Sequence, residues 1–136
     1  MANQQRKIKV LLAQFPLETH SRGLVTVAGM LRDAGMEVIL MGNARSEQII
    51  KVAVQESADV VGISSYCGGE LVLGDELLTI AEKEGIKDNA VFIMGGIFPP
   101  NDAPKLKEIG FSASFPPSAT KEEIVSTIKS AVAAKR

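Results

Sequence analysis

The feature that most constrains the fold is a regular alternation of short apolar runs with longer amphipathic stretches. Each β-rich apolar run is followed by a pattern with helical periodicity. The predicted strands are 8–13, 37–41, 60–63, 91–94 and 112–115, and the predicted helices are 24–34, 47–56, 70–84, 103–109 and 121–134. Strands that alternate with helices in this way indicate a parallel sheet covered by helices on both faces.

Residues with capping preferences mark the ends of these helices. Glycines at positions 35, 85 and 110 each follow a predicted helix. The predicted N-caps are Ser46, Asn101 or Asp102, and Thr120, which has Glu123 three residues later in a capping-box arrangement.

The chain length and the handedness of crossovers fix the expected architecture. A chain of 136 residues suits one domain, 1–136, with residues 1–6 as a flexible N-terminus. Right-handed crossovers favour the strand order 2-1-3-4-5. The expected fold class is therefore α/β, a flavodoxin-like five-stranded parallel sheet whose switch point lies between the first and third strands.

Composition excludes several classes of function. Lys plus Arg number 15 and Asp plus Glu number 16, so the formal net charge of -1 gives no electrostatic footprint for nucleic acid or an anionic membrane. No apolar run approaches the roughly 20 residues of a membrane-spanning helix. A single cysteine excludes an internal disulfide framework. We expect a cytoplasmic protein that binds neither nucleic acid nor membrane.

The only histidine lies where ligands bind in such a sheet. The segment Glu18-Thr19-His20-Ser21-Arg22-Gly23 connects the first predicted strand to the first predicted helix, and open α/β sheets bind ligands at that corner. A carboxylate two residues before an imidazole can orient the ring through one nitrogen and leave the other to bind a metal. Gly23 allows close approach of the backbone.

The loops after the later strands add to this site. Ser64-Ser65-Tyr66 follows the third strand, Gly95-Gly96 the fourth and Pro116-Pro117-Ser118-Ala119 the fifth. Together with Glu18-x-His20-x-x-Gly23, they resemble the cobalamin-binding domains of the base-off, His-on class, which carry Asp-x-His-x-x-Gly, Ser-x-Leu and Gly-Gly at these places. The resemblance covers about residues 7–125. The flanks 32–39, 95–100 and 102–108 are most similar to the small subunits or C-terminal domains of methylmalonyl-type acyl-CoA mutases.

The resemblance implies a cofactor, a metal ligand and a partner. His20 would bind the cobalt of adenosylcobalamin as its lower axial ligand, and the displaced nucleotide tail would enter a cleft beside Ser64, Gly95 and Gly96. The cofactor-binding residues implied are Glu18, His20, Ser21, Arg22, Gly23, Ser64, Tyr66, Gly95, Gly96, Pro117 and Ser118. In that family a larger TIM-barrel subunit holds the acyl-CoA and the cofactor performs the radical rearrangement. The chain would thus be the small subunit of an isomerase.

Three departures from the family pattern leave an alternative open. Glu18 replaces Asp and adds a methylene, so we expect the loop to shift for Glu18 to reach the imidazole. A weaker or longer hydrogen bond would make His20 less basic and its orientation less fixed. Tyr66 replaces Leu beside the tail cleft, and Pro116-Pro117-Ser118-Ala119 replaces Gly-Pro-Gly-Thr. The alternative is a divergent, non-catalytic module that keeps the fold and has weak or lost cobalamin binding.

Other proteins of this fold lack the expected residues here. Response regulators need an acidic cluster after the first strand, where this chain has Gln14-Phe15, and an Asp closing the third strand, where it has Ile63-Ser64. With one histidine and no carboxylate pair expected at a strand edge, we predict no self-sufficient enzyme.

Two apolar stretches predict contact with another subunit. Residues 24–31 are apolar on more than one helical stripe, and residues 71–73 are three consecutive apolar residues near the ligand edge. A surface helix of a monomer usually has a single apolar stripe. We therefore expect part of this surface to be covered by the partner.

Overall fold

The computed structural model describes residues 6–66 and 68–136, and in these residues five strands alternate with five helices. The strands are β1 (Lys9–Gln14), β2 (Glu37–Asn43), β3 (Val60–Ser65), β4 (Val91–Gly96) and β5 (Ala113–Phe115), and the helices are α2 (Arg22–Asp33), α3 (Ser46–Glu56), α4 (Glu70–Lys83), α5 (Asp102–Ile109) and α6 (Lys121–Lys135). Of the N-terminus predicted to be flexible, only Arg6 lies within the described residues, where it pairs with Asp59 at 3.0 Å.

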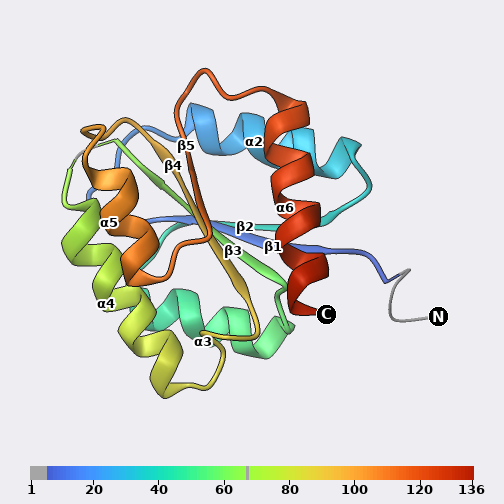
Figure 1. The fold of residues 1–136 in the computed structure, drawn as a ribbon, viewed down its shortest axis with the longest axis horizontal. Helices are drawn as coiled ribbons and strands as arrows, with labels where there is room; N and C mark the ends of the chain where they lie inside the picture. Colours follow the sequence, from blue (N-terminus) through green and yellow to red (C-terminus); the bar gives the residue numbers. More distant parts are fainter. Residues whose placement is uncertain (1–5, 67) are drawn as a thin grey trace.

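The sheet has the predicted topology. All its strands are parallel and their order is β2-β1-β3-β4-β5 (Figure 1). β1 lies between β2 and β3, so successive connections leave it in opposite directions along the sheet. The gap between the loops that follow β1 and β3 is therefore the switch point, where open α/β sheets bind ligands.

Helices cover both faces of the sheet. Figure 1 shows α2 and α6 on one face and α3, α4 and α5 on the other. Alternate residues of β1 point to opposite faces, as the pleat requires. Leu11 and Ala13 pack in the core under α3, α4 and α5, whereas Val10 and Leu12 pack in the core under α2 and α6.

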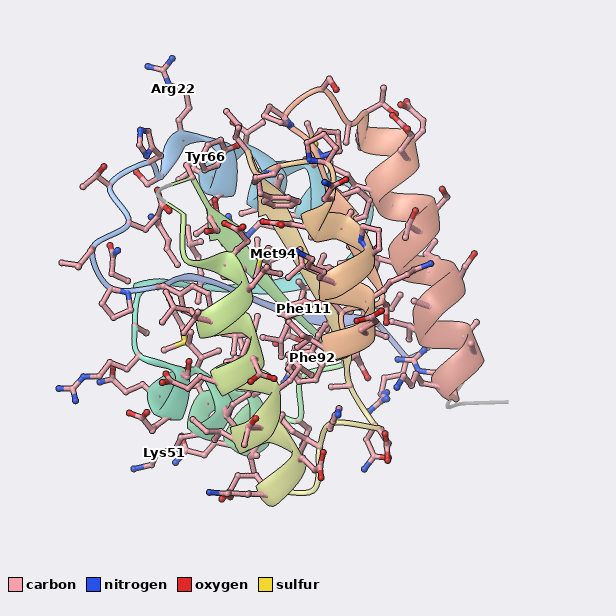
Figure 2. The ribbon with its side chains drawn as sticks, turned by 60° about the vertical axis from the view of Figure 1, so that its left-hand side comes forward. Arg22, Lys51, Tyr66, Phe92, Met94 and Phe111 are labelled. Carbon is pink, nitrogen blue, oxygen red and sulfur yellow. The ribbon has the colours of Figure 1, made fainter. Side chains whose placement is uncertain are left out.

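The core beneath α4 and α5 is closely packed. The rings of Phe92 on β4 and Phe111 meet edge to face, with centroids 6.4 Å apart (Figure 2). A Cβ atom on Gly74 of α4 would lie 3.0 Å from the Phe111 ring, so α4 approaches the sheet closely there. Side chains therefore fill the space between this face of the sheet and its helices.

The predicted caps have different outcomes at the three helices. Asn101 holds the cap position of α5, but its side chain makes no capping hydrogen bond. The Thr120 hydroxyl accepts from the Glu123 N–H at 3.1 Å, and the Glu123 carboxylate accepts from the Thr120 N–H at 2.8 Å, which confirms the capping box. Ser46 was expected to cap α3, but Arg45 holds the cap position. The Gln48 side chain accepts the Arg45 N–H at 3.0 Å, which starts the helix one residue earlier. Among the described residues, the Ser46 hydroxyl is buried without a hydrogen-bond partner.

Among the described residues, no helix is both long enough and apolar enough to cross a membrane.

Candidate functional site

A cavity of about 710 Å³ opens at the carboxyl edge of the sheet, between the strands and the helices α2 and α6. Its walls are mainly apolar and come from every layer of this face: Leu12, Val27, Met30, Ile93, Phe115 and Ile124. Its rim includes His20, Ser64, Tyr66 and Gly95 from the loops at the switch point. The sequence predicted the residues of the rim from its polar side chains and glycines. It did not predict the apolar wall, because the pattern of these residues is that of an ordinary hydrophobic core.

A tight turn presents the histidine loop. The Glu18 N–H donates to the Phe15 carbonyl at 3.2 Å, closing a turn over Pro16 and Leu17. Leu17 has a φ of 74°, a left-handed conformation that costs a non-glycine residue about 1–2 kcal/mol. Leu17 is 91% exposed. Such strain is found mainly at functional sites.

Two side-chain amides hold the same loop from below. Gln14 ends β1 and its amide donates to the carbonyls of Glu18 and His20 at 3.3 and 3.4 Å. Asn43 ends β2 and its amide donates to the carbonyls of Phe15 and Glu18 at 3.0 and 2.7 Å. Sequence reasoning missed both residues. The available signal was a polar amide ending an otherwise apolar strand.

Glu18 binds the ring of His20 directly. Its Oε2 lies 2.9 Å from His20 Nδ1 and also accepts the His20 N–H at 3.3 Å. The expectation of a longer bond is wrong, because 2.9 Å is an ordinary length for a charge-assisted hydrogen bond. The Glu18 side chain is 4% exposed and the His20 side chain 60% exposed. A carboxylate accepts only, so the proton of this bond is on Nδ1 and Nε2 is the nitrogen suited to a metal.

The second carboxylate oxygen joins Glu18 to the next strand. Glu18 Oε1 accepts the backbone N–H of Tyr66, the first residue after β3, at 2.7 Å. One buried carboxylate thus connects the loops on both sides of the switch point. The shorter Asp of the family pattern has one methylene less with which to span the same two groups.

The two glycines that end β4 stand at their positions for different structural reasons. Gly96 has a φ of 146°, and a Cβ atom there would lie 1.8 Å from the Ser65 carbonyl oxygen, so the approach of the β3 and β4 ends requires glycine. Gly95 has only an ordinary contact, 3.7 Å from the Phe115 carbonyl, and lines the cavity. Ser64 is 6% exposed and also lines it.

The remaining predicted site residues lie at the start of α2 and in the loop after β5. Ser21, Arg22 and Gly23 line the cavity mouth, and Figure 2 shows the Arg22 side chain pointing away from the body of the protein. Pro117 lines the cavity, as do its neighbours Pro116 and Ala119. Ser118 is exposed and is not among the lining residues, so its predicted role stays a prediction.

A carboxylate pair lies at the edge of the sheet, contrary to expectation. Glu70 begins α4 and Asp102 begins α5, and they are 6% and 8% exposed. Burial, and next a hydrogen bond to the Asp102 side chain, raise the pKa of Glu70. The pair was missed because its members are distant in sequence and meet only through the topology. Neither residue lines the cavity beneath His20.

The donor set limits which metal could bind. No group of three or more His, Cys, Asp or Glu side chains in the described residues could hold a metal ion. A metal bound through His20 would therefore have to bring most of its own ligands, as in a macrocyclic complex. The apolar cavity beside His20 provides room for an organic part of such a ligand, so the residues present fit a corrinoid.

Comparisons with known proteins agree with this chemistry. A family model described as the B12 binding domain matches residues 8–128. The small subunit of 2-hydroxyisobutanoyl-CoA mutase from Aquincola tertiaricarbonis is 36% identical over 132 residues, 96% of each chain. The small subunit of pivalyl-CoA mutase from Xanthobacter autotrophicus is 36% identical over 124 residues, 90% of this chain and 82% of that one.

Larger relatives and solved structures match in part. Methylmalonyl-CoA mutase from Escherichia coli is 33% identical over 118 residues, 86% of this chain and 16% of that protein. A cobalamin-binding protein structure from Desulfitobacterium hafniense has a TM-score of 0.75 at 21% identity and covers 89% of this chain and 57% of its own. The receiver domain of NarL from Mycobacterium tuberculosis, with a TM-score of 0.71 at 15% identity over 94% of this chain and 98% of its own, shares the fold. The chain belongs to the B12-binding domain family.

Proposed function

We propose that this chain is the cobalamin-binding small subunit of an adenosylcobalamin-dependent acyl-CoA mutase, a cytoplasmic isomerase that is active only with a larger TIM-barrel subunit. The observation that carries the proposal is the Glu18–His20 pair, with its 2.9 Å bond, at the mouth of an apolar cavity. Relatives matched over most of their own length are mutase small subunits, which supports the same reading.

Each residue of the site has a role in this proposal. His20 would hold cobalt from below through Nε2, and Glu18 keeps the ring in the required tautomer and direction. The apolar cavity would accept the nucleotide tail, with the Ser64 hydroxyl as a polar contact at its rim. When bound, adenosylcobalamin supplies the radical chemistry of carbon-skeleton rearrangement. This chain contributes binding and axial ligation, and the partner contributes the acyl-CoA site.

Exposed apolar residues support a partner at the same edge. Leu17, Val72 and Ile97 are 91%, 75% and 63% exposed, and they follow or adjoin the ends of β1, β3 and β4. On α2, Val25 is 56% exposed although Leu24, Ala28 and Leu31 are buried. Apolar side chains left open around a ligand edge are typical of a surface that a second subunit covers.

The test is a spectral titration of cobalamin with wild-type protein and with His20→Ala. We expect the wild-type protein to shift the absorption spectrum to the base-off, His-on form and the variant not to do so. The same shift in His20→Ala would contradict axial ligation. Adding a large mutase subunit as the partner should then give mutase activity on a branched acyl-CoA.

The same titration distinguishes this proposal from the alternative of a divergent, non-catalytic module. That alternative expects no stoichiometric cobalamin uptake, whereas the proposal expects one cobalamin per chain. The direct Glu18–His20 bond favours the proposal, because Glu18, one of the departures that motivated the alternative, keeps the contact that orients the ligand.

A further inference from the structure

Tyr66 spans the mouth of the cavity. It follows β3 directly, and its hydroxyl oxygen lies 3.0 Å from the place where a Cβ atom on Gly23 would be. Two further ring carbons lie 3.8 Å from the same point. The side chain therefore reaches from the end of β3 to the first turn of α2, and Figure 2 shows it at this edge of the sheet. Both residues line the cavity.

The same residue contacts the histidine site in two ways. The rings of Tyr66 and His20 have centroids 5.6 Å apart and are tilted by 38°. The Tyr66 backbone N–H holds Glu18 Oε1 at 2.7 Å, and Glu18 Oε2 holds His20 Nδ1. The backbone of Tyr66 thus positions the proposed metal ligand, while its ring partly closes the adjoining cavity. The two parts can act separately because rotation about χ1 moves the ring without moving the N–H.

We propose that the Tyr66 ring is a gate that determines which corrinoids bind quickly, because it must turn aside for a nucleotide tail but not for a corrin ring alone. This inference rests on the proposed function. A corrinoid without a tail reaches His20 from outside and leaves the Tyr66 ring in place. A complete cobalamin must displace the ring from its contact with Gly23 before the tail enters the cavity.

The experiment compares binding rates of cobalamin and of cobinamide, the corrinoid that lacks the nucleotide tail. Stopped-flow absorption would follow both with wild-type protein, Tyr66→Leu and Tyr66→Phe. We expect Tyr66→Leu to bind cobalamin about tenfold faster, with cobinamide changed less than about twofold. Tyr66→Phe keeps the ring and removes only the hydroxyl that reaches Gly23, so its cobalamin binding rate should lie between those of the wild-type protein and Tyr66→Leu. A slower or unchanged cobalamin rate in Tyr66→Leu, or an equal change for both corrinoids, would overturn the gate.

A second measurement needs no substitution. Tyr66 is the only tyrosine of the chain, so protein labelled with 3-fluorotyrosine gives a single fluorine NMR signal from this ring. The difference in its shift between H₂O and D₂O reports exposure to solvent. We expect this difference to increase with cobalamin and to stay constant with cobinamide, and a decrease with cobalamin would contradict the gate. Failure of the proposed function would look different, since the wild-type protein would then show no His-on spectrum with either corrinoid.

Discussion

A single buried carboxylate, that of Glu18, connects the residues of this site. Glu18 accepts N–H donors from His20 and from Tyr66, and it does so while 4% exposed. Partners of this kind orient a metal-ligating histidine, and their loss usually costs ten- to a hundredfold in metal affinity. The affinity of this protein for cobalamin should therefore depend on Glu18 as strongly as on any residue other than His20.

Three substitutions at Glu18 should rank in order of the contacts they keep. Glu18→Asp retains the charge with a shorter reach, Glu18→Gln retains the length but replaces one acceptor oxygen by a donor, and Glu18→Ala loses both contacts. We expect cobalamin dissociation constants to rise least for Asp, by about tenfold for Gln and by up to about a hundredfold for Ala. Spectral titration measures them, and Glu47→Gln on the exposed side of α3 is the control for loss of charge. If all three variants bound cobalamin with the affinity of the wild-type protein, Glu18 would have no role in binding.

Two adjacent glycines should respond to alanine in different ways. A methyl on Gly96 would collide with the Ser65 carbonyl, so Gly96→Ala should lower the free energy of unfolding by more than about 3 kcal/mol. Gly95→Ala has only ordinary contacts and should change it by less than about 1 kcal/mol, while its methyl enters the cavity and weakens cobalamin binding. Urea unfolding and cobalamin titration of both variants separate the two effects. A stable, fully folded Gly96→Ala protein would show that the β3 and β4 ends can move apart.

At the residue scale, the sequence indicated which residues pair in the site but did not indicate the geometry of their contacts. A carboxylate beside the only histidine predicted their pairing, and the pairing is present. The expected longer bond was wrong, since the two atoms lie 2.9 Å apart. The positive φ of Leu17 in the preceding turn was also missed, because a leucine does not signal this conformation. The bond from Tyr66 to Glu18 joins residues 48 positions apart, and sequence separation of this size carries no local signal.

Among the elements, the N-termini of α4 and α5 meet through Glu70 and Asp102. Desolvation by burial and then the hydrogen bond to the Asp102 side chain raise the pKa of Glu70 above its ordinary value. A carboxyl with a higher pKa in the folded chain favours folding when protonated. Its contribution is present below the unfolded pKa and is lost as pH rises through the folded pKa. The junction of α4 with α5 should therefore be tighter at acidic pH than at neutral pH.

Glu70→Gln tests this pH dependence. The amide can still donate to Asp102 but carries no charge, so we expect the Tm at pH 7 to rise by a few degrees. The gain over wild type should shrink as pH falls below the raised pKa of Glu70, where the wild-type side chain is also neutral. Thermal unfolding followed by circular dichroism between pH 4 and 8 measures both, with Glu76→Gln on the exposed face of α4 as the control. If the increase in Tm were the same at every pH, the effect of the substitution would come from packing and not from the charge of Glu70.

Element boundaries were predictable where the signal is local. The Thr120 and Glu123 capping box and the short strand β5 appear where the pattern placed them. The start of α3 was misplaced because Gln48, and not the Ser46 hydroxyl, satisfies the first backbone donor. The carboxylate pair could not be read from the sequence, since Glu70 and Asp102 begin different helices and only the order of β3 and β4 makes them neighbours.

On the scale of the whole molecule, the two faces of the sheet have different tasks. The face under α3, α4 and α5 is filled, with the Phe92 and Phe111 rings in contact. The face under α2 and α6 contains the cavity, and its helices are the walls of that cavity. The second face has its own buried core, which includes Leu31 and Ile128, and the cavity opens beside this core at the switch point. The exposed apolar residues lie at the edge shared by both, which is where a partner could close over a bound corrinoid.

The last prediction concerns that shared edge. A Leu17→Ser, Ile97→Ser double variant removes two large apolar side chains from residues that are 91% and 63% exposed. We expect cobalamin affinity and Tm to stay within error of wild type, because neither side chain lines the cavity or packs in the core. The concentration of small subunit that gives half-maximal mutase activity with a fixed amount of large subunit should rise about tenfold, as expected for loss of interface anchors. Val54→Ser is the matched control, since Val54 is 43% exposed but lies near the end of α3, away from this edge. If Val54→Ser weakened the assembly as much as the double variant, the partner would have to bind the other end of the sheet, and the apolar residues around His20 would need another explanation.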